Sequence, residues 1–183
     1  CEVSLHTSHQ LLAGETYAGL VEVGVGLVPA GGGTKELALR NYEMMKLSEN
    51  GDPSAFIQRA FMLIGMGRTS TSGHEAIEMG LYPSGSTVSL SRDHQTERAK
   101  HIALQMVAAG YAPKIPASGV KVLGDPGIQT FRMMLYNMVA GRQVSEYDAF
   151  IGEKVATILC GGEVDAGTIV NEQHFLDLER RVF

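Results

Sequence analysis

The chain has 183 residues, of which 44% are hydrophobic and 19% are charged, and this composition predicts a globular domain with a buried core. Its net charge is −5 and its 15 Lys and Arg residues are scattered, so we expect no nucleic-acid partner. No apolar run approaches the roughly 18 residues that would indicate a membrane span. The two cysteines form no disulfide framework, which predicts a cytoplasmic location. Because Cys1 opens the chain without a signal peptide, we expect a segment of a longer protein.

The first 34 residues are rich in glycine and poor in charge. Gly24, Gly26 and the run Gly31 to Gly33 lie close together around Pro29. Glycines so placed are typical of tight turns and of close backbone approach. This part therefore predicts short strands and turns, with a helix that opens near Gly31.

The remainder predicts a mostly helical body, so the predicted fold class is mostly α with a small α/β part at the N-terminus. Apolar periodicity and capping residues predict helices over residues 34–46, 53–64, 72–80 and 92–109, and a short strand over residues 87–90. Prolines and glycines in residues 111–124 predict a linker. The predicted division is therefore residues 1–110, the linker 111–124, and a helical extension over residues 125–183.

Three further helices are predicted in that extension. Asp125 before a proline, Ser145 and Asn171 are suitable N-terminal caps for them. Apolar stripes predict that the first buries Ile128, Phe131, Leu135, Met138 and Val139, the second Tyr147, Ile151, Val155 and Ile158, and the third Phe175, Leu178 and Val182.

Glu2 and Glu22 are the strongest candidates for chemistry, because each lies in an otherwise apolar segment. A buried carboxylate needs a partner or a function to offset its loss of hydration. Two carboxylates in different environments can serve as acid and base on one substrate. A solvated surface position is the alternative for each of them.

Two other patterns give weaker signals. His6 and His9 have the spacing of a helix-borne metal pair, but the sequence offers no third ligand, and we predict no metal site. The run from Gly31 to Gly33 lacks the spacing of a phosphate-binding loop. We expect it instead to bring the N-terminal end of a helix, which favours negative charge, close to an active site.

Three motifs in the same order carry a family resemblance. Residues 18–34 resemble the crotonase signature, in which a segment ending in Glu precedes Gly-x-x-Pro and a glycine-rich helix start. Cys1-Glu2-Val3 resembles the family's Cys-Glu segment twenty positions earlier, and residues 71–81 resemble a later helix motif. The resemblance covers residues 1 to about 110. The sequence around Glu22 and Gly31, and the stretch from about residue 111 to residue 183, resemble bacterial proteins in which a 3-hydroxyacyl-CoA dehydrogenase domain precedes a crotonase domain.

The resemblance implies the C-terminal part of a crotonase fold, with the first half of that fold absent. It implies hydration of an enoyl thioester, in which Glu2 activates water and Glu22 delivers a proton to C2. Substrate binding is implied for Gly26, Pro29, Ala30 and Gly31. The family's two oxyanion-stabilising N–H groups would lie upstream of Cys1, so this chain alone is expected to be inactive.

The same resemblance implies acyl-CoA as the partner of the parent protein, and a homo-oligomer. No cofactor is expected in this segment, and NAD is expected in the absent dehydrogenase domain. The alternative hypothesis is a helical packing or oligomerisation module, in a dehydrogenase whose crotonase part is not catalytic.

Overall fold

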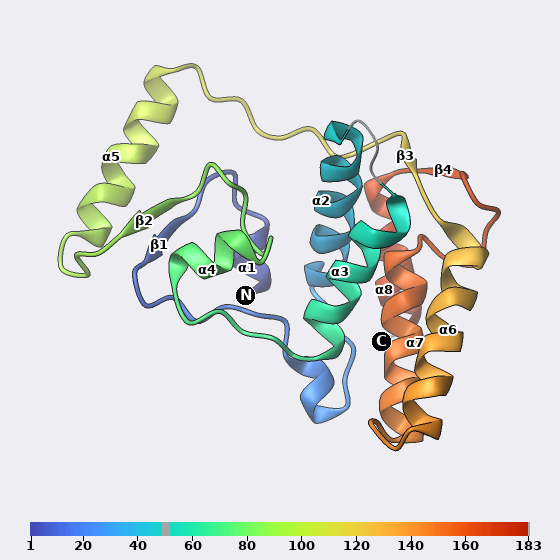
Figure 1. The fold of residues 1–183 in the computed structure, drawn as a ribbon. Coiled ribbons are helices and arrows are strands. Elements are labelled where there is room, and N and C mark those ends of the chain that lie inside the picture. The colour runs from blue at the N-terminus through green and yellow to red at the C-terminus, as the bar shows by residue number, and fades with distance from the viewer. Residues whose placement is uncertain (49–51, 183) are drawn as a thin grey trace. The chain divides into compact units, whose positions relative to one another are not determined.

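The computed structural model describes residues 1–48 and 52–182, and this part of the chain is mostly helical (Figure 1), as predicted. Its helices are α1 (Glu2–Leu5), the 3-10 helix η1 (Glu22–Val25), α2 (Gly33–Leu47), α3 (Pro53–Gly65), α4 (Gly73–Glu78), α5 (Gln95–Ala108), α6 (Gly124–Ala140), α7 (Glu146–Leu159) and α8 (Glu172–Val182). Its strands are β1 (Leu11–Ala13), β2 (Thr87–Ser89), β3 (Val120–Lys121) and β4 (Ile169–Val170). None of these helices is long and apolar enough to cross a membrane.

The chain folds into two compact units that do not follow its sequence order. Unit 1 contains Cys1 and residues 3–19 and 69–115. Unit 2 contains Glu2, the segment from Leu20 to Arg68 and the chain from Pro116 onward. One junction therefore falls inside the predicted linker 111–124, whereas the chain also passes between the units after residues 19 and 68. The division at residues 110 and 125 stays a prediction about sequence domains.

Unit 1 is built on a pair of parallel strands. Strand β1 runs beside β2, and Leu12 lies opposite Val88. Helix α4 begins close to this pair: a Cβ on Gly73 would lie 2.7 Å from the carbonyl oxygen of Ala13, so only glycine fits there. Ser72 caps α4 by accepting the N–H of Glu75, as its sequence predicts.

Helix α5 is the exposed element of unit 1. The helix predicted over residues 92–109 is present, but it contains no buried residue: Ala99 and Ala103 are exposed and Met106 is half-buried. Leu104 and Val107 are also exposed. Alanine and methionine favour helix formation on their own, so the pattern indicated a helix without indicating what covers it.

Unit 2 is a cluster of five helices. Helix α7 packs against α2, α3, α6 and α8, and its residues Val155, Ile158 and Leu159 are fully buried (Figure 1). Helix α2 is covered on several sides, so even Lys35 is 1% exposed. Its ammonium lies 2.5 Å from the carboxylate of Glu36 and 2.7 Å from that of Glu172. The short strands β3 and β4 form an antiparallel pair in this unit.

The starts of the last three helices are largely as predicted. Ser145 and Asp148 form a reciprocal capping box on α7, and Asn171 accepts the N–H of His174 in the first turn of α8. Asp125 is not the cap of α6, because that helix already begins at Gly124 and the N–H of Asp125 donates to the carbonyl of Val164.

The predicted buried stripes hold at most but not all positions. Tyr147 was predicted to be buried and is 58% exposed, because its hydroxyl reaches out to the carbonyl of Gly26. Met138, Val139 and Val182 are half-buried. The other predicted positions are buried: Ile128, Phe131, Leu135, Ile151, Val155, Ile158, Phe175 and Leu178.

Candidate functional site

The two glutamates singled out by the sequence lie together in unit 2, and their carboxyl groups share a hydrogen bond. Glu2 is the first residue of α1, and Glu22 is the first residue of η1. The 3-10 turn forms because the chain tightens at Gly26, whose left-handed φ of 77° lets its N–H reach back to the carbonyl of Val23. Both side chains are partly buried.

Their environments shift the pKa values of the two carboxyl groups in opposite directions. The hydrogen bond with Glu22 lowers the pKa of Glu2 to about 2. Burial, together with the hydrogen bond to Glu2, raises the pKa of Glu22. Near neutral pH, Glu2 is therefore ionised, and Glu22 is the member of the pair that holds a proton more firmly. A carboxylate beside a second carboxyl group of raised pKa is an arrangement suited to acid–base catalysis.

One oxygen of Glu22 has no protein partner. Its Oε2 atom is buried and makes no hydrogen bond within the described residues. Buried polar atoms in folded proteins nearly always have a partner, and the exceptions often mark places that bind a water or a substrate. Oε2 of Glu22 is thus a buried acceptor within the described residues that a water or a substrate could satisfy.

A glycine turn packs against the other member of the pair. Gly31 and Gly32 have φ values of 70° and 83°, in the left-handed region that favours glycine. A Cβ on Gly33 would lie 3.1 Å from Cγ of Glu2 and 2.9 Å from Cδ2 of Leu20. The turn can therefore approach the Glu2 side chain closely only because this position lacks a side chain.

The N-terminal end of α2 is already occupied by an anion from the chain itself. The carboxylate of Glu179 on α8 accepts the N–H of Gly32 at 2.8 Å and that of Lys35 at 2.7 Å. Glu179 is 5% exposed. The positive end of the helix dipole therefore acts on Glu179, and the expected approach of this helix end to an active site stays a prediction. In the sequence, Glu179 lies in a polar stretch near the end of the last helix, and this pattern does not indicate that its carboxylate binds the start of α2.

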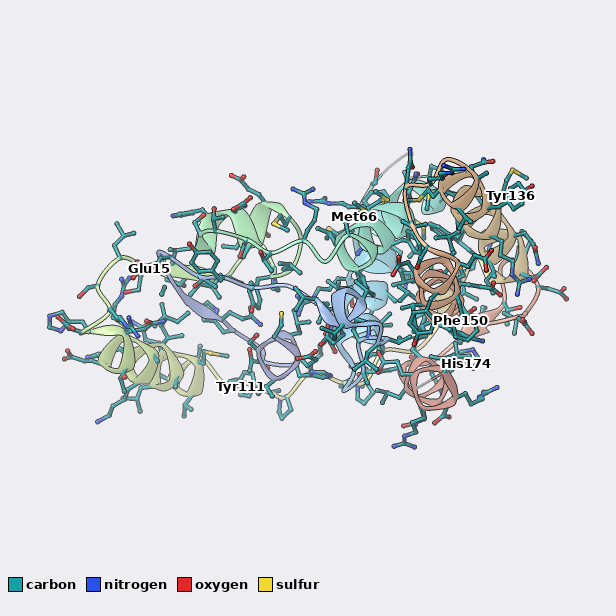
Figure 2. All side chains as sticks on the ribbon, turned by 90° about the horizontal axis from the view of Figure 1, so that it is seen from below. Glu15, Met66, Tyr111, Tyr136, Phe150 and His174 are labelled. Carbon is teal, nitrogen blue, oxygen red and sulfur yellow. The ribbon has the colours of Figure 1, made fainter. Side chains whose placement is uncertain are left out.

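An apolar cavity of about 400 Å³ is lined in part by the sequence neighbours of Glu22, although Glu22 itself does not line it. Val21 and Val23, on either side of Glu22 in the sequence, form one part of its wall together with Gly24. The remaining lining comes from the helices of unit 2 and the turns that adjoin them: Phe61, Met62, Gly65, Met66, Gly67, Leu135, Met138, Val144, Asp148, Ile151 and Gly152. Met66, one of these lining residues, follows α3 and is labelled in Figure 2. Sequence reasoning missed the cavity, because its wall is built from segments far apart in the chain.

The other predicted site residues lie along the segment that joins η1 to α2. The hydroxyl of Tyr147 donates to the carbonyl of Gly26 at 3.0 Å, and Thr34 donates to the carbonyl of Pro29 at 3.0 Å. Ala30 and Gly31 border a shallow hollow beside Glu179 on α8. Their predicted role in substrate binding stays a prediction.

His6 is exposed and His9 is half-buried, in keeping with the prediction that they are not a metal pair on a helix. Helix α1 ends at Leu5, so His6 and His9 do not lie on one helix, and Nε2 of His9 lies 3.0 Å from the hydroxyl of Thr87. Within residues 1–48 and 52–182, no group of three His, Cys, Asp or Glu side chains is arranged to hold a metal ion.

Comparison with known proteins adds one relative. The chain is 35% identical over 182 residues to a Bacillus subtilis (strain 168) protein named "Probable 3-hydroxyacyl-CoA dehydrogenase". The match takes in the whole of this chain but only 22% of that protein, so the chain spans about a fifth of its relative's length. No protein-family model matches the chain.

The name of this relative supports one of the predictions and does not test the others. Its name agrees with the expected relation to a 3-hydroxyacyl-CoA dehydrogenase, which is an enzyme. The name does not mention a hydratase or a crotonase domain. The crotonase fold and the hydration chemistry are therefore proposals, taken up next.

Proposed function

We propose that this chain supplies the acid–base pair of a site that hydrates a trans-2-enoyl thioester. The observation that carries the proposal is the hydrogen-bonded pair itself, in which Glu2 is ionised, Glu22 has a raised pKa, and one buried Glu22 oxygen has no partner. Such a pair can hold a water molecule and move a proton in each direction. The crotonase resemblance of the segments around both glutamates supports the same chemistry.

The proposed steps balance within the pair. Glu2 accepts a proton from water, and the water oxygen forms the new bond to C3 of the enoyl group. The C2=C3 π electrons form the new C2–H bond with the proton that Glu22 delivers. Glu2 is then protonated and Glu22 ionised, and a proton passes between them along their hydrogen bond to restore the starting state. Because both carboxyls lie together, both parts of water add from the same side.

The cavity fits an apolar substrate portion near the reacting atoms. Its wall begins at Val21 and Val23, the neighbours of Glu22, and is formed largely by aliphatic, aromatic and methionine side chains. Burial of an acyl chain there would gain roughly 0.8 kcal/mol for each methylene removed from water. We propose that the acyl chain lies in this cavity.

We further propose that the whole protein pairs this hydration with NAD-dependent oxidation in fatty acid β-oxidation. Hydration yields a 3-hydroxyacyl thioester, which is the kind of substrate named for the Bacillus subtilis relative. NAD would bind outside this chain. The glycine turn does not suit a dinucleotide, because Glu179 already occupies the N–H groups that a pyrophosphate would need.

A second proposal, for an oligomerisation surface, rests on a different observation. Tyr136 on α6 and Phe150 on α7 are 73% and 53% exposed (Figure 2), and Met133 is 69% exposed. Exposed apolar groups on neighbouring helices favour association. A homo-oligomer, and the alternative role as a packing module, would both use such exposed side chains. Self-association with no effect of Glu2 or Glu22 substitutions on catalysis would favour the packing role alone.

The test is hydration of crotonyl-CoA by the full-length protein, followed by loss of the enoyl absorbance. Glu2→Gln and Glu22→Gln each keep the size of the side chain and remove its ability to exchange a proton. We expect each to lower kcat by roughly 10²–10⁴-fold. Glu15→Gln is the matched control, because Glu15 is exposed in unit 1 and should leave kcat unchanged. Full activity in the Glu2 and Glu22 variants would refute the proposal.

A further inference from the structure

Glu179 is a buried carboxylate that the proposed chemistry does not use. It lies on the inner side of α8, is 5% exposed, and accepts two backbone N–H groups from the start of α2. Two charge-assisted hydrogen bonds and the positive end of a 15-residue helix offset the hydration that this carboxylate loses. Its position therefore fixes the backbone of Gly32 and Lys35 rather than a side chain.

The glycine turn that hydrogen-bonds to Glu179 also packs against the Glu2 side chain. Gly32, one of its two donors, lies between Gly31 and Gly33. Ideal Cβ positions on those two neighbours would be 3.7 Å and 3.1 Å from Cγ of Glu2. A carboxylate on α8 is thus connected to the Glu2 side chain through one glycine turn. The turn has left-handed φ values at two successive glycines, so it needs outside contacts to keep one conformation.

The surrounding charges make Glu179 distinct from the other acidic groups of α8. Lys35, the nearest buried cation on α2, is paired through its side chain with Glu36 and Glu172. Asp177, two residues before Glu179, is half-buried, accepts from Gln173 and lies 3.7 Å from Arg180. Glu179 differs in that its carboxylate accepts backbone N–H groups at the glycine turn and the first turn of α2.

We propose that Glu179 is a positioning residue for Glu2, acting through the Gly31–Gly33 turn to hold the Glu2 side chain in place for proton transfer. This inference rests on the proposed function for its catalytic meaning. It assigns the last helix of the chain a role in the geometry of a pair formed near the other end of the sequence.

The experiment compares Glu179→Gln with Asp177→Asn in the full-length protein. Glu179→Gln keeps the side-chain shape but removes the charge and one of the two accepting oxygens. We expect kcat for crotonyl-CoA hydration to fall roughly 10- to 100-fold while KM changes less than about threefold, because a misplaced proton carrier slows chemistry more than binding. Asp177→Asn should leave both constants unchanged. Circular dichroism checks that both variants keep their helices.

A second readout does not depend on hydratase activity. The carboxyl carbon of Glu2 is titrated by ¹³C NMR in the unmodified protein and in both variants. Removal of a nearby negative charge alone would lower the pKa of Glu2, whereas loosening of its hydrogen bond with Glu22 raises it. We expect the pKa of Glu2 to rise in Glu179→Gln and not in Asp177→Asn.

The outcomes separate this inference from the proposed function. An unchanged kcat in Glu179→Gln, with the Glu2 titration unmoved or lowered, overturns the positioning role even if the protein is a hydratase. If the unmodified protein does not hydrate crotonyl-CoA, the proposed function fails. The Glu2 titration then still decides whether Glu179 holds the turn against that side chain.

Discussion

The two units of the chain differ in how they treat polar and apolar groups. Unit 2 buries charged side chains, Lys35 and Glu179 among them, and gives each one hydrogen-bonded partners. Unit 1 leaves a whole helix, α5, without a buried residue. Buried polar groups are retained where their geometry matters, since each one loses hydration. The buried charged side chains of the described residues are thus in unit 2, the unit that also contains the proposed Glu2–Glu22 pair.

The comparison also shows that sequence neighbourhood is a poor guide to the site. The crotonase-like motifs run from residue 1 to about 110 and so cross both units. Unit 2 instead combines Glu2, Glu22 and the glycine turn with Glu179, which is more than 140 residues further along the chain. Predictions that contrast the two units test this division.

The largest expected effect is on stability. Leu159→Ala removes a fully buried side chain from α7 and should lower the free energy of unfolding of unit 2 by about 2–5 kcal/mol. Leu104→Ala, the same change on α5, should alter stability by less than about 0.5 kcal/mol because Leu104 is 57% exposed. Hydrogen exchange of α7 and α5 peptides in urea measures both. Equal effects would mean that α5 is covered in the full-length protein.

The next effect is on catalysis. Gly33→Ala would place a Cβ 2.9 Å from Leu20 and 3.1 Å from Glu2, so one of them must shift. We expect kcat for crotonyl-CoA hydration to fall by about 10²-fold, the penalty typical of a displacement near 1 Å. Gly85→Ala in unit 1 is the control, since its Cβ would meet nothing within 4 Å. A Gly33→Ala protein with normal kcat would separate the turn from the chemistry.

The smallest effect concerns substrate length. Val21→Trp should partly fill the cavity and lower kcat/KM for a ten-carbon enoyl-CoA about 10-fold relative to crotonyl-CoA, since fewer methylenes can be buried. Val25→Trp is the control, because Val25 belongs to the same 3-10 helix but does not line the cavity. A ratio that moves equally in both variants would place the acyl chain elsewhere.

Local features were predictable from the sequence. The bounds of α2 and α3, and the caps at Ser72, Ser145 and Asn171, follow from periodicity and from side chains that bond their own helix. The proximity of Glu2 and Glu22 was implied by the family resemblance, whereas periodicity alone indicated only two unusual carboxylates.

Non-local features were not predictable. In the sequence, Glu179 is one of several charged residues near the end of the last helix. Its sequence neighbours do not indicate that the start of α2 is its hydrogen-bond partner. Tyr147 has the spacing of a core residue, yet its hydroxyl bonds to Gly26, 121 positions away. The cavity depends on helices that meet only after folding. Such features depend on tertiary contacts, which single-sequence patterns do not encode.

The central claim is that Glu2 and Glu22 form a hydrogen-bonded carboxyl pair in which the pKa of Glu2 is lowered and the pKa of Glu22 is raised. Titration of both carboxyl carbons by ¹³C NMR in the full-length protein tests it most directly, with Glu15 as an exposed reference. We expect Glu2 to titrate near pH 2 and Glu22 to titrate above its ordinary pKa. The lowered pKa of Glu2 then stabilises the folded state above about pH 4.5, and this stabilisation is lost as the pH falls toward 2. The raised pKa of Glu22 has the opposite effect on the free energy of unfolding: its stabilising contribution is present at low pH and is lost as the pH rises through that pKa. Two carboxyls that both titrate near the ordinary value of 4.5 would contradict the account.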